Sequence, residues 1–323
     1  MKRIGVYTSG GDAPGMNAAI RAVVRASISN GIEPFGIMRG YEGMIDGNIF
    51  AMDAKSVSNI IQRGGTILKT SRSERFRTVE GREQAFQNLR KHEIDGLVAI
   101  GGDGTFAGAK AFSSEHNIPV IGVPGTIDND LYGTDFTIGY DTALNTAMDA
   151  IDKIRDTADS HNRLFIIEVM GRDAGFIALN TGIAAGAEAV LIPETPTFIN
   201  DIISKLEQGW LRSKSSSIIV VAEGDQGGGA FQVAEEIKQK FNHYSIRVVV
   251  LGHIQRGGTP SCADRVLASR LGAAAVEGLM EGLSNSMAGI IGGQVQYTSF
   301  IKACKQHQSI NPNLLKLVEI LSV

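Results

Sequence analysis

Short, uninterrupted apolar runs recur along the chain, and each is rich in valine and isoleucine. They do not alternate with polar residues, as a strand with one wet face would. Strands buried on both faces of a parallel sheet have this pattern. The pattern therefore predicts buried strands at seven places: residues 3–8, 96–101, 120–125, 164–171, 189–194, 217–224 and 247–253.

The segments between these runs have a helical period. Residues 16–31 end in Asn30-Gly31, a pair suited to a helix C-terminus. Residues 141–158 place Leu144, Met148, Ile151 and Ile154 on one stripe, and residues 231–241 and 263–282 behave in the same way. Strand–helix alternation of this kind predicts an α/β fold with covered parallel sheets.

Glycines and charged residues gather directly after the predicted strands. Ligands of open α/β sheets bind in the crevice beyond the carboxyl ends of the strands. We therefore expect a ligand site built from "SGGDAPG", "GDGT", "PGTIDND", "MGRDAG", "EG" and "HIQRGG".

Composition narrows the class of protein. The chain has 323 residues, which suggests about two domains, with 43% apolar and 20% charged residues. The net charge of −3 gives no general basic surface for nucleic acid, so an anion site must be local. The two cysteines, the absence of a leader-like start and the absence of long apolar runs predict a soluble, cytoplasmic protein without a disulfide framework.

Residues 9–17, "SGGDAPGMN", form a glycine-rich stretch between a predicted strand and a predicted helix. Backbone N–H groups at a helix N-terminus bind phosphate well. The stretch is neither a P-loop nor G-x-G-x-x-G, so a tight strand–helix turn is an equally good interpretation.

Residues 101–108, "GGDGTFAG", place Asp103 between glycines. One carboxylate with little around it suits Mg²⁺, which keeps several waters and bridges phosphate oxygens. The alternative is that Asp103 caps the following helix.

In "PGTIDND", Asp128 and Asp130 follow an apolar run. At strand pitch these two carboxylates would point to the same side. One could accept a proton while the other holds substrate or metal, as phosphoryl transfer requires. The alternative is an Asx-turn with solvated carboxylates.

Arginines near the strand ends supply the opposite charge. Arginine forms planar, bidentate contacts with phosphate. The candidates are Arg72 (with Arg75 and Arg77 nearby), Arg163, Arg172, Arg247 and Arg256, the last close to His253. The residues alone thus predict a Mg²⁺-dependent phosphoryl-transfer enzyme with an anionic substrate.

Together, "TSGGDAPGMNAAIR", "IGGDGT", "PGTIDND", "EVMGR" and "GHIQRGG" resemble the bacterial 6-phosphofructokinase family over essentially the whole chain. The resemblance implies transfer of the γ-phosphoryl of MgATP to the 1-hydroxyl of fructose 6-phosphate, the committed step of glycolysis. It implies two Rossmann-like three-layer αβα domains with mostly parallel sheets and the active site in the cleft between them. The larger, ATP-binding domain would comprise residues 1–139 and 253–305, and the smaller, sugar-phosphate domain residues 140–252 and 306–323.

The resemblance also implies roles for individual residues. Asp128 would be the base and Asp103 the Mg²⁺ ligand, with Thr126, Gly11 and Arg172 as further catalytic residues. The nucleotide site would contain Gly11, Tyr41, Arg72, Arg77, Asp103, Gly104, Thr105 and Gly108. The sugar phosphate would be held by Thr126, Asp128, Asp130, Arg163, Met170, Gly171, Arg172, Glu223, Arg247, His253 and Arg256.

Members of the family are homotetramers, so Arg163 and Arg247 would act across a subunit interface. An effector site for ADP and phosphoenolpyruvate would match Arg21, Arg25, Asn59, Arg155, Glu188, Arg212 and Lys214. Asn59 stands where an aspartate is usual and Ser215 where a second lysine is usual, which predicts altered or weak regulation. A solvated helix face is the alternative for Arg21, Arg25 and Arg155.

Two other functions remain open at this point. A pyrophosphate-dependent subclass generally carries Asp and Lys where this chain has Gly104 and Gly125, so ATP is favoured. A sensor of nucleotide or sugar phosphate could keep the fold and lose catalysis, because fold alone does not establish function. Such a sensor would not need Asp103, Thr126, Asp128 and Arg172 together.

Overall fold

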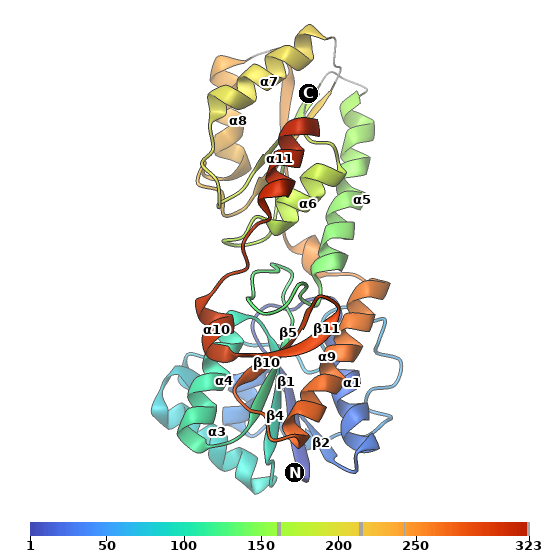
Figure 1. The fold of residues 1–323 in the computed structure, drawn as a ribbon, viewed down its shortest axis with the longest axis vertical. Coiled ribbons are helices and arrows are strands. Elements are labelled where there is room, and N and C mark those ends of the chain that lie inside the picture. Colours follow the sequence, from blue (N-terminus) through green and yellow to red (C-terminus); the bar gives the residue numbers. More distant parts are fainter. Residues whose placement is uncertain (160–162, 213–215, 242, 322–323) are drawn as a thin grey trace. The chain divides into compact units, whose positions relative to one another are not determined.

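The computed structural model describes residues 1–159, 163–212, 216–241 and 243–321. The chain forms two compact units, traced by sequence colour in Figure 1. The first comprises residues 1–127, 131–142 and 256–308, and the second residues 128–130, 143–255 and 309–323. We expected the chain to pass from one domain to the other after residues 139, 252 and 305, and in the structure it does so after residues 142, 255 and 308. Residues 128–130, which we expected in the first domain, belong to the second unit.

The first unit contains a seven-stranded sheet in the order β11-β10-β5-β4-β1-β2-β3. The five inner strands are parallel, and β3 and β11 pair antiparallel at the two edges. The strands are β1 (Arg3–Thr8), β2 (Glu33–Ile37), β3 (Ile49–Ala51), β4 (Gly96–Gly101), β5 (Val120–Pro124), β10 (Ser286–Ile291) and β11 (Gln294–Ser299).

Helices cover both faces of this sheet (Figure 1). Helices α1 and α9 pack against each other on one face. On the other, α3 and α4 share an aromatic-rich core that includes Tyr7, Phe106, Phe112 and Phe300. The bounds are α1 (Met16–Ser29), α2 (Gly40–Asp46), η1 (Arg75–Arg77), α3 (Val79–Lys91), α4 (Asp103–His116), α9 (Cys262–Met280) and α10 (Phe300–Lys305).

The second unit contains a four-stranded parallel sheet in the order β7-β8-β6-β9. Its strands are β6 (Arg163–Val169), β7 (Ala189–Leu191), β8 (Ser217–Ala222) and β9 (Ser245–Val250). Helices α7 and α8 cover a core with Leu164, Ile166 and Ile219, while α6 packs on the sheet and carries α11. The helices are α6 (Phe176–Ala184), α7 (Ile199–Leu211), α8 (Gly229–Lys240) and α11 (Pro312–Leu321), together with most of α5 (Tyr140–Asp159) and η2 (Gly252–Arg256). The first three residues of α5 and the last residue of η2 belong to the first unit.

All seven predicted strands form, and the predicted α/β class with mostly parallel sheets is confirmed. Four strands of the first unit were missed: β2, β3, β10 and β11. In β2, Pro34 and Gly36 interrupt the apolar run, and β11 alternates between half-buried and exposed positions at a sheet edge.

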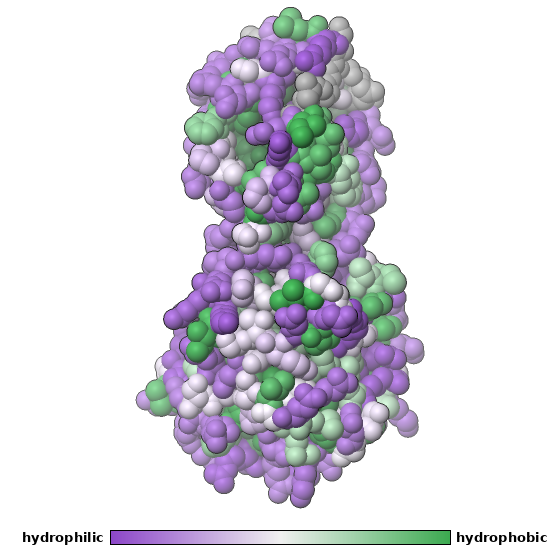
Figure 2. All heavy atoms as spheres, viewed as in Figure 1, coloured by the Kyte–Doolittle hydropathy of each residue, from purple (hydrophilic) through white to green (hydrophobic). Residues whose placement is uncertain are grey.

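Hydrophilic residues cover most of the face in Figure 2, with scattered apolar patches between them. Within the described residues, every helix is too short or too polar to cross a bilayer.

A buried carboxylate fixes the start of α5. Asp264, in the first turn of α9, accepts hydrogen bonds from the N–H groups of Gly139 and Thr142, both at 2.8 Å, and from the Thr142 hydroxyl at 2.5 Å. The first N–H groups of a helix have no partner within it, so Asp264 supplies acceptors that α5 lacks. Asp264 is 1% exposed, and this burial raises the pKa of its carboxyl.

The glycine-rich loop packs against the residues that precede α5. Gly15 and Gly139 have φ values of +105° and +102°, which glycine adopts readily. A Cβ on Gly15 would lie 2.6 Å from Cγ2 of Ile138, and one on Gly139 would lie 2.7 Å from Cβ of Ala13. The position of the loop therefore depends on the start of α5.

Replacing Asp264 should destabilise the protein. Asp264→Ala leaves buried donors without an acceptor, and we expect it to lower the free energy of unfolding by about 2–4 kcal/mol. Chemical denaturation measures this difference.

Asp95→Ala is the matched control, because Asp95 also accepts two backbone N–H groups, those of Lys2 and Arg3, but is exposed. Water can replace Asp95, so its loss should be below about 1 kcal/mol. If the two variants lost the same free energy of unfolding, burial would not be the reason why Asp264 matters for stability.

Candidate active site

The carboxyl ends of three neighbouring parallel strands bring the first-unit motifs together. Strands β5, β4 and β1 are adjacent, so the segments that follow them leave the same edge of the sheet. The N–H of Ser9 donates to Ile100 and the N–H of Gly125 donates to Gly101, both at 3.0 Å. The Thr105 hydroxyl donates to the carbonyl of Ser9 at 3.2 Å. The structure thus joins the stretches 9–15, 101–105 and 124–126.

Arg256 lies on the glycine-rich loop. Its Nη1 donates to the carbonyl of Asp12 at 3.2 Å, and a Cβ built on Gly11 would lie 2.7 Å from the same nitrogen. A side chain at this position would have to displace the guanidinium from the loop. A cation thus sits against the stretch that we predicted to bind phosphate, which strengthens the phosphate interpretation over a plain turn.

Asp103 is the first residue of α4 and is half-buried. The N-cap position belongs to Gly102 and has no side-chain cap, so the alternative that Asp103 is the N-cap residue is wrong. The next residue is exposed, and a Cβ on Gly104 would meet nothing within 4 Å. A carboxylate beside open space at a positive helix end is a suitable place for a cation together with phosphate.

This donor set fits Mg²⁺ in particular. Among the described residues, no group of three or more His, Cys, Asp or Glu side chains could hold a metal ion by itself. Magnesium usually needs only one or two carboxylates, because waters and substrate phosphates complete its shell.

Tyr41 packs against the first turns of α4. Its hydroxyl donates to the carbonyl of Thr105 at 2.5 Å and accepts a bond from the Tyr7 hydroxyl at 3.0 Å. Its ring stacks on Phe76 with a centroid distance of 3.9 Å, and a Cβ on Gly108 would lie 3.0 Å from that ring. Burial raises the pKa of both tyrosines. A direct nucleotide contact by Tyr41 or Gly108 stays a prediction.

The stretch 124–130 differs from expectation. Strand β5 ends at Pro124, the chain bends at residues 127 and 128, and Asn129 has a φ of +54°. The assumption of strand pitch for Asp128 and Asp130 is therefore wrong. Asp128 is 7% exposed and Asp130 is half-buried, so the two carboxylates have different environments.

The arginines of residues 72–77 divide into two groups. Arg75 forms salt bridges with Glu42 and Asp46 of α2, the second at 2.6 Å, and is therefore structural. All three arginines are exposed, and Arg77 forms only a local, exposed pair with Glu74 at 3.4 Å, so its guanidinium is accessible to a ligand, as is that of Arg72. The two acidic partners lie about 30 residues earlier in the chain, so no local pattern distinguishes the three arginines.

In the second unit, Glu223 holds the turn that carries Arg172. Its Oε1 accepts the N–H of Arg172 at 2.7 Å and that of Gly171 at 3.3 Å. Arg172 has a φ of +54°, and a Cβ on Gly224 would lie 2.0 Å from its carbonyl oxygen. Backbone in sparsely populated regions persists only where the surroundings fix it, often at functional sites.

Gln255 is a positioning residue that sequence reasoning missed. It is fully buried, and its Oε1 accepts the N–H of Met170 at 2.9 Å. Its one sequence signal is its place in "GHIQRGG". The predicted ligand residues His253 and Arg172 are exposed. Arg163 and Arg247 lie on the adjacent strands β6 and β9, and Arg247 is exposed.

The predicted effector residues belong to both units. Arg21 and Arg25 lie on α1, and Asn59 has a φ of +53°, which asparagine tolerates better than most residues. In the second unit, Arg155 donates to the carbonyl of Ala185, and buried Glu188 accepts the N–H of Ile218 at 2.6 Å. Arg212 is exposed at the end of α7, whereas Lys214 and Ser215 lie outside the described residues.

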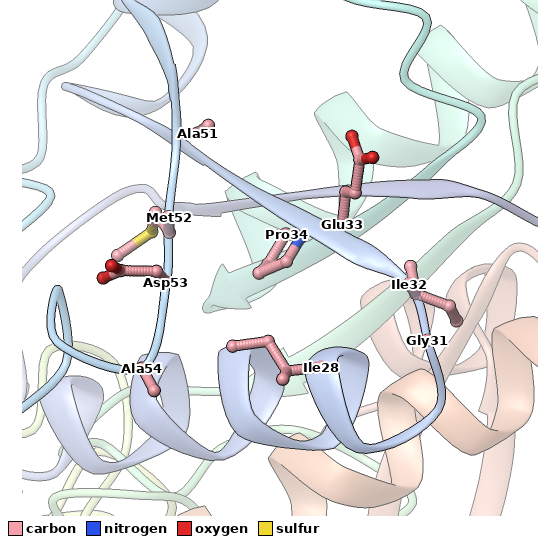
Figure 3. A pocket seen from close by; sticks show the side chains of 9 residues that line it. All are labelled: Ile28, Gly31, Ile32, Glu33, Pro34, Ala51, Met52, Asp53 and Ala54. Atoms are coloured by element: carbon pink, nitrogen blue, oxygen red, sulfur yellow. The ribbon is translucent and has the colours of Figure 1, made fainter.

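A separate hollow of about 420 Å³ lies between the end of α1 and the strands β2 and β3 (Figure 3). It contains none of the predicted site residues. It is lined by Ile28, Gly31, Ile32, Glu33, Pro34, Ala51, Met52, Asp53 and Ala54.

Comparison with known proteins decides the family. The sequence model of the family described as Phosphofructokinase matches residues 3–279. The chain belongs to the phosphofructokinase family. The ATP-dependent 6-phosphofructokinase of Cytophaga hutchinsonii is 60% identical over 322 residues, which cover this whole chain and 98% of that protein. The ATP-dependent 6-phosphofructokinase 1 of Thermus thermophilus is 57% identical over the full length of both chains.

Solved phosphofructokinase structures have the same fold. The phosphofructokinase of Saccharomyces cerevisiae matches with a TM-score of 0.90 and 34% identity, over this whole chain and 47% of that one. A pyrophosphate-dependent phosphofructokinase from Marinobacter aquaeolei matches with a TM-score of 0.85, over this whole chain and 92% of that one. At 23% identity the second likeness concerns the fold alone.

The Arg75 cluster should give this phosphofructokinase a pH-dependent stability term. Hydrogen bonds from Ser73 and Arg75 lower the pKa of Glu42, and Arg75 lowers the pKa of Asp46. Groups with lowered pKa values stabilise the fold above their unfolded values, here 4.5 and 3.8, and lose this contribution as the pH falls through the folded values. Arg75→Ala should therefore be less stable than the wild type at pH 7, and this difference should be small, because the cluster is solvent-exposed, and should shrink below about pH 4.

Urea denaturation between pH 3 and pH 7 measures this difference. Lys238→Ala is the control, because the pair of Lys238 with Glu235 is long, at 3.9 Å, and exposed. A difference for Arg75→Ala that stays constant with pH would contradict the assignment.

Proposed function

We propose that this chain transfers the γ-phosphoryl group of MgATP to the 1-hydroxyl of fructose 6-phosphate, giving fructose 1,6-bisphosphate and ADP. One observation carries the proposal: full-length identity of 54–60% with eight bacterial ATP-dependent 6-phosphofructokinases. The joined motifs at one edge of the first sheet support it.

Asp128 would act as the base. Its carboxylate is buried at the end of the stretch after β5, so a bound hydroxyl would meet it with little competing water. It would accept the proton of the 1-hydroxyl as the hydroxyl oxygen attacks phosphorus. Asp130, more exposed, would hold the sugar.

Asp103 would hold Mg²⁺ together with the phosphate oxygens. When bound, the metal would neutralise negative charge on the phosphates. The N-terminus of α4 adds a positive field at the same place. Gly11, Arg72 and Thr126 would contact the transferring phosphates, and Arg172 would stabilise charge on the phosphoryl group in the transition state.

The remaining predicted residues would bind the two substrates. The nucleotide would lie against α4 near Gly104, Thr105 and Gly108, with Tyr41 as support and Arg77 as a cation. The sugar phosphate would be held by Met170, Gly171, Glu223, His253 and Arg256. Because Glu223 already accepts two backbone bonds through one oxygen, its second oxygen is the atom we assign to the sugar.

ATP is the favoured donor. The position of Gly104 is open, so a nucleotide has room there that a side chain would take. Gly125 differs, because its Cβ would lie 3.1 Å from methyl groups of both Ile100 and Met16. Room for the nucleotide therefore explains Gly104, while packing explains Gly125.

The assembly and location of the enzyme are further proposals. We expect a cytoplasmic homotetramer in which Arg163 and Arg247 reach the sugar phosphate of a neighbouring subunit. The first unit would bind ATP and the second the sugar phosphate.

A donor comparison tests the function. Purified protein with Mg²⁺ and fructose 6-phosphate should turn over with ATP and not with pyrophosphate in an assay coupled to fructose 1,6-bisphosphate formation. Turnover with pyrophosphate alone would overturn the assignment of ATP as the donor. Absence of turnover with either donor would favour the alternative that the protein is a sensor.

Asp128→Ser is the matched variant. General-base catalysis contributes about 10²–10⁴-fold, so turnover should fall by that factor while fructose 6-phosphate still binds in calorimetry. Unchanged turnover would remove Asp128 as the base.

Regulation should be weakened. Asn59 and Ser215 replace an aspartate and a lysine of the expected effector site, and loss of a cation weakens phosphate binding. We expect the half-saturating fructose 6-phosphate concentration to shift by less than about threefold (below about 0.7 kcal/mol) with saturating ADP or phosphoenolpyruvate.

Initial-rate measurements with and without each effector check this. Ser215→Lys together with Asn59→Asp should enlarge the shift. A wild-type response already larger than about tenfold would contradict weakened regulation.

A further inference from the structure

The segment from Arg63 to Lys69 leads to Arg72, and it contains no helix or strand. Its backbone groups therefore need partners outside any regular ladder. The side chain of Asn17, the second residue of α1, forms hydrogen bonds with three of these backbone groups. Its Nδ2 donates to the carbonyls of Arg63 and Gly64 at 3.0 and 3.1 Å, and its Oδ1 accepts the N–H of Ile67 at 2.7 Å.

The amide orientation of Asn17 is fixed by these partners. The N–H of Ile67 can only donate, so the atom facing it is the oxygen, and the carbonyls of Arg63 and Gly64 can only accept. Asn17 is 1% exposed, so water cannot replace any of the three bonds. An unsatisfied buried polar group costs about 1–3 kcal/mol, which makes this geometry strongly preferred.

Further contacts hold the rest of the segment. The hydroxyls of Thr8 and Thr66 are 3.0 Å apart, and the Thr8 hydroxyl donates to the carbonyl of Lys69 at 2.9 Å. The N–H of Arg39 donates to Leu68 at 2.7 Å.

Glycine allows close packing on the other side. A Cβ on Gly64 would lie 2.2 Å from the carbonyl oxygen of Gly258, two residues after Arg256. The two "QRGG" stretches of the chain therefore touch each other, and Asn17 holds one of them against α1.

We propose that Asn17 is a positioning residue for phosphoryl transfer, which fixes the segment 63–69 so that Arg72 is presented to the phosphates. This role rests on the proposed function, in which Arg72 contacts the transferring phosphates. Charge stabilisation depends on placement to within about 1 Å, and a misplacement of that size can cost about 10²-fold in rate. Asn17 lies at the start of the helix that follows the glycine-rich loop, so it links the two phosphate-binding parts of the first unit.

A double-mutant cycle with Arg72 distinguishes positioning from general stability. Asn17→Ala should lower kcat about 10–100-fold and change the KM for fructose 6-phosphate less than about twofold. In an Arg72→Ala background the same substitution should change kcat by less than about twofold, because Arg72 is no longer there to be misplaced. A purely structural loss would reduce kcat by the same factor in both backgrounds and would overturn the proposal.

Ser27→Ala is the matched control. Ser27 is a buried polar residue on the same helix, but its hydroxyl donates to the carbonyl of Val23 within that helix and, among the described residues, to no loop. It should leave kcat within about twofold of the wild type. If Asn17→Ala does not fold, Thr66→Val removes the bond to Thr8 and the weaker bond from the N–H of Leu68 with little change of shape, and it should show the same non-additivity with Arg72→Ala.

Hydrogen exchange supplies a readout that does not depend on activity. Amides of residues 63–72 should exchange at least about tenfold faster in Asn17→Ala than in the wild type, and not in Ser27→Ala. Unchanged exchange there would overturn the proposal even if kcat fell. Absence of turnover in the wild type would overturn the proposed function instead, and exchange would still show whether Asn17 holds the segment.

Discussion

The carboxylate of Asp264 is the constraint on which the arrangement of the first unit depends. It accepts the N–H groups of Gly139 and Thr142 where α5 begins, and it is buried. Gly15 and Gly139, both with positive φ, fit around this corner without a Cβ. The glycine-rich loop, the start of α5 and the start of α9 are therefore fixed together, although they come from three distant parts of the sequence.

The same principle operates at each loop of the candidate site. These loops lack a helical or sheet ladder, so their backbone groups need side-chain partners. Asn17 serves the segment that leads to Arg72, Glu223 serves the turn of Arg172, and Gln255 serves Met170. Buried or backbone-bound polar residues thus set the positions, while exposed cations remain available for phosphate. Asn17 and Gln255 are buried, whereas Glu223 is exposed and is also a predicted sugar ligand, so a positioning role and a ligand role can meet in one residue.

Sequence could predict what depends on local pattern. The buried strands β1, β4 and β5 have continuous apolar runs, and chemistry at their carboxyl ends follows from parallel topology. It could not predict what depends on distant partners. Arg75 and Arg72 have similar neighbours along the sequence, yet it is Arg75 that forms salt bridges with Glu42 and Asp46. The bend at Asp128 and the left-handed conformation of Asn129 likewise cannot be read from the spacing of the aspartates.

The two glycines that bear on donor choice have different physical roles. A side chain at Gly104 would enter open space and compete only with a ligand. A side chain at Gly125 would press on Met16 of α1 and Ile100 of β4, at the root of the glycine-rich loop and beside Asp103. A lysine there would therefore require the methyl groups of these two residues to shift by a few tenths of an ångström before it could offer its charge to a phosphate. Donor preference in this chain is consequently a property of the packing of β4, β5 and α1 as well as of the groups that touch the nucleotide.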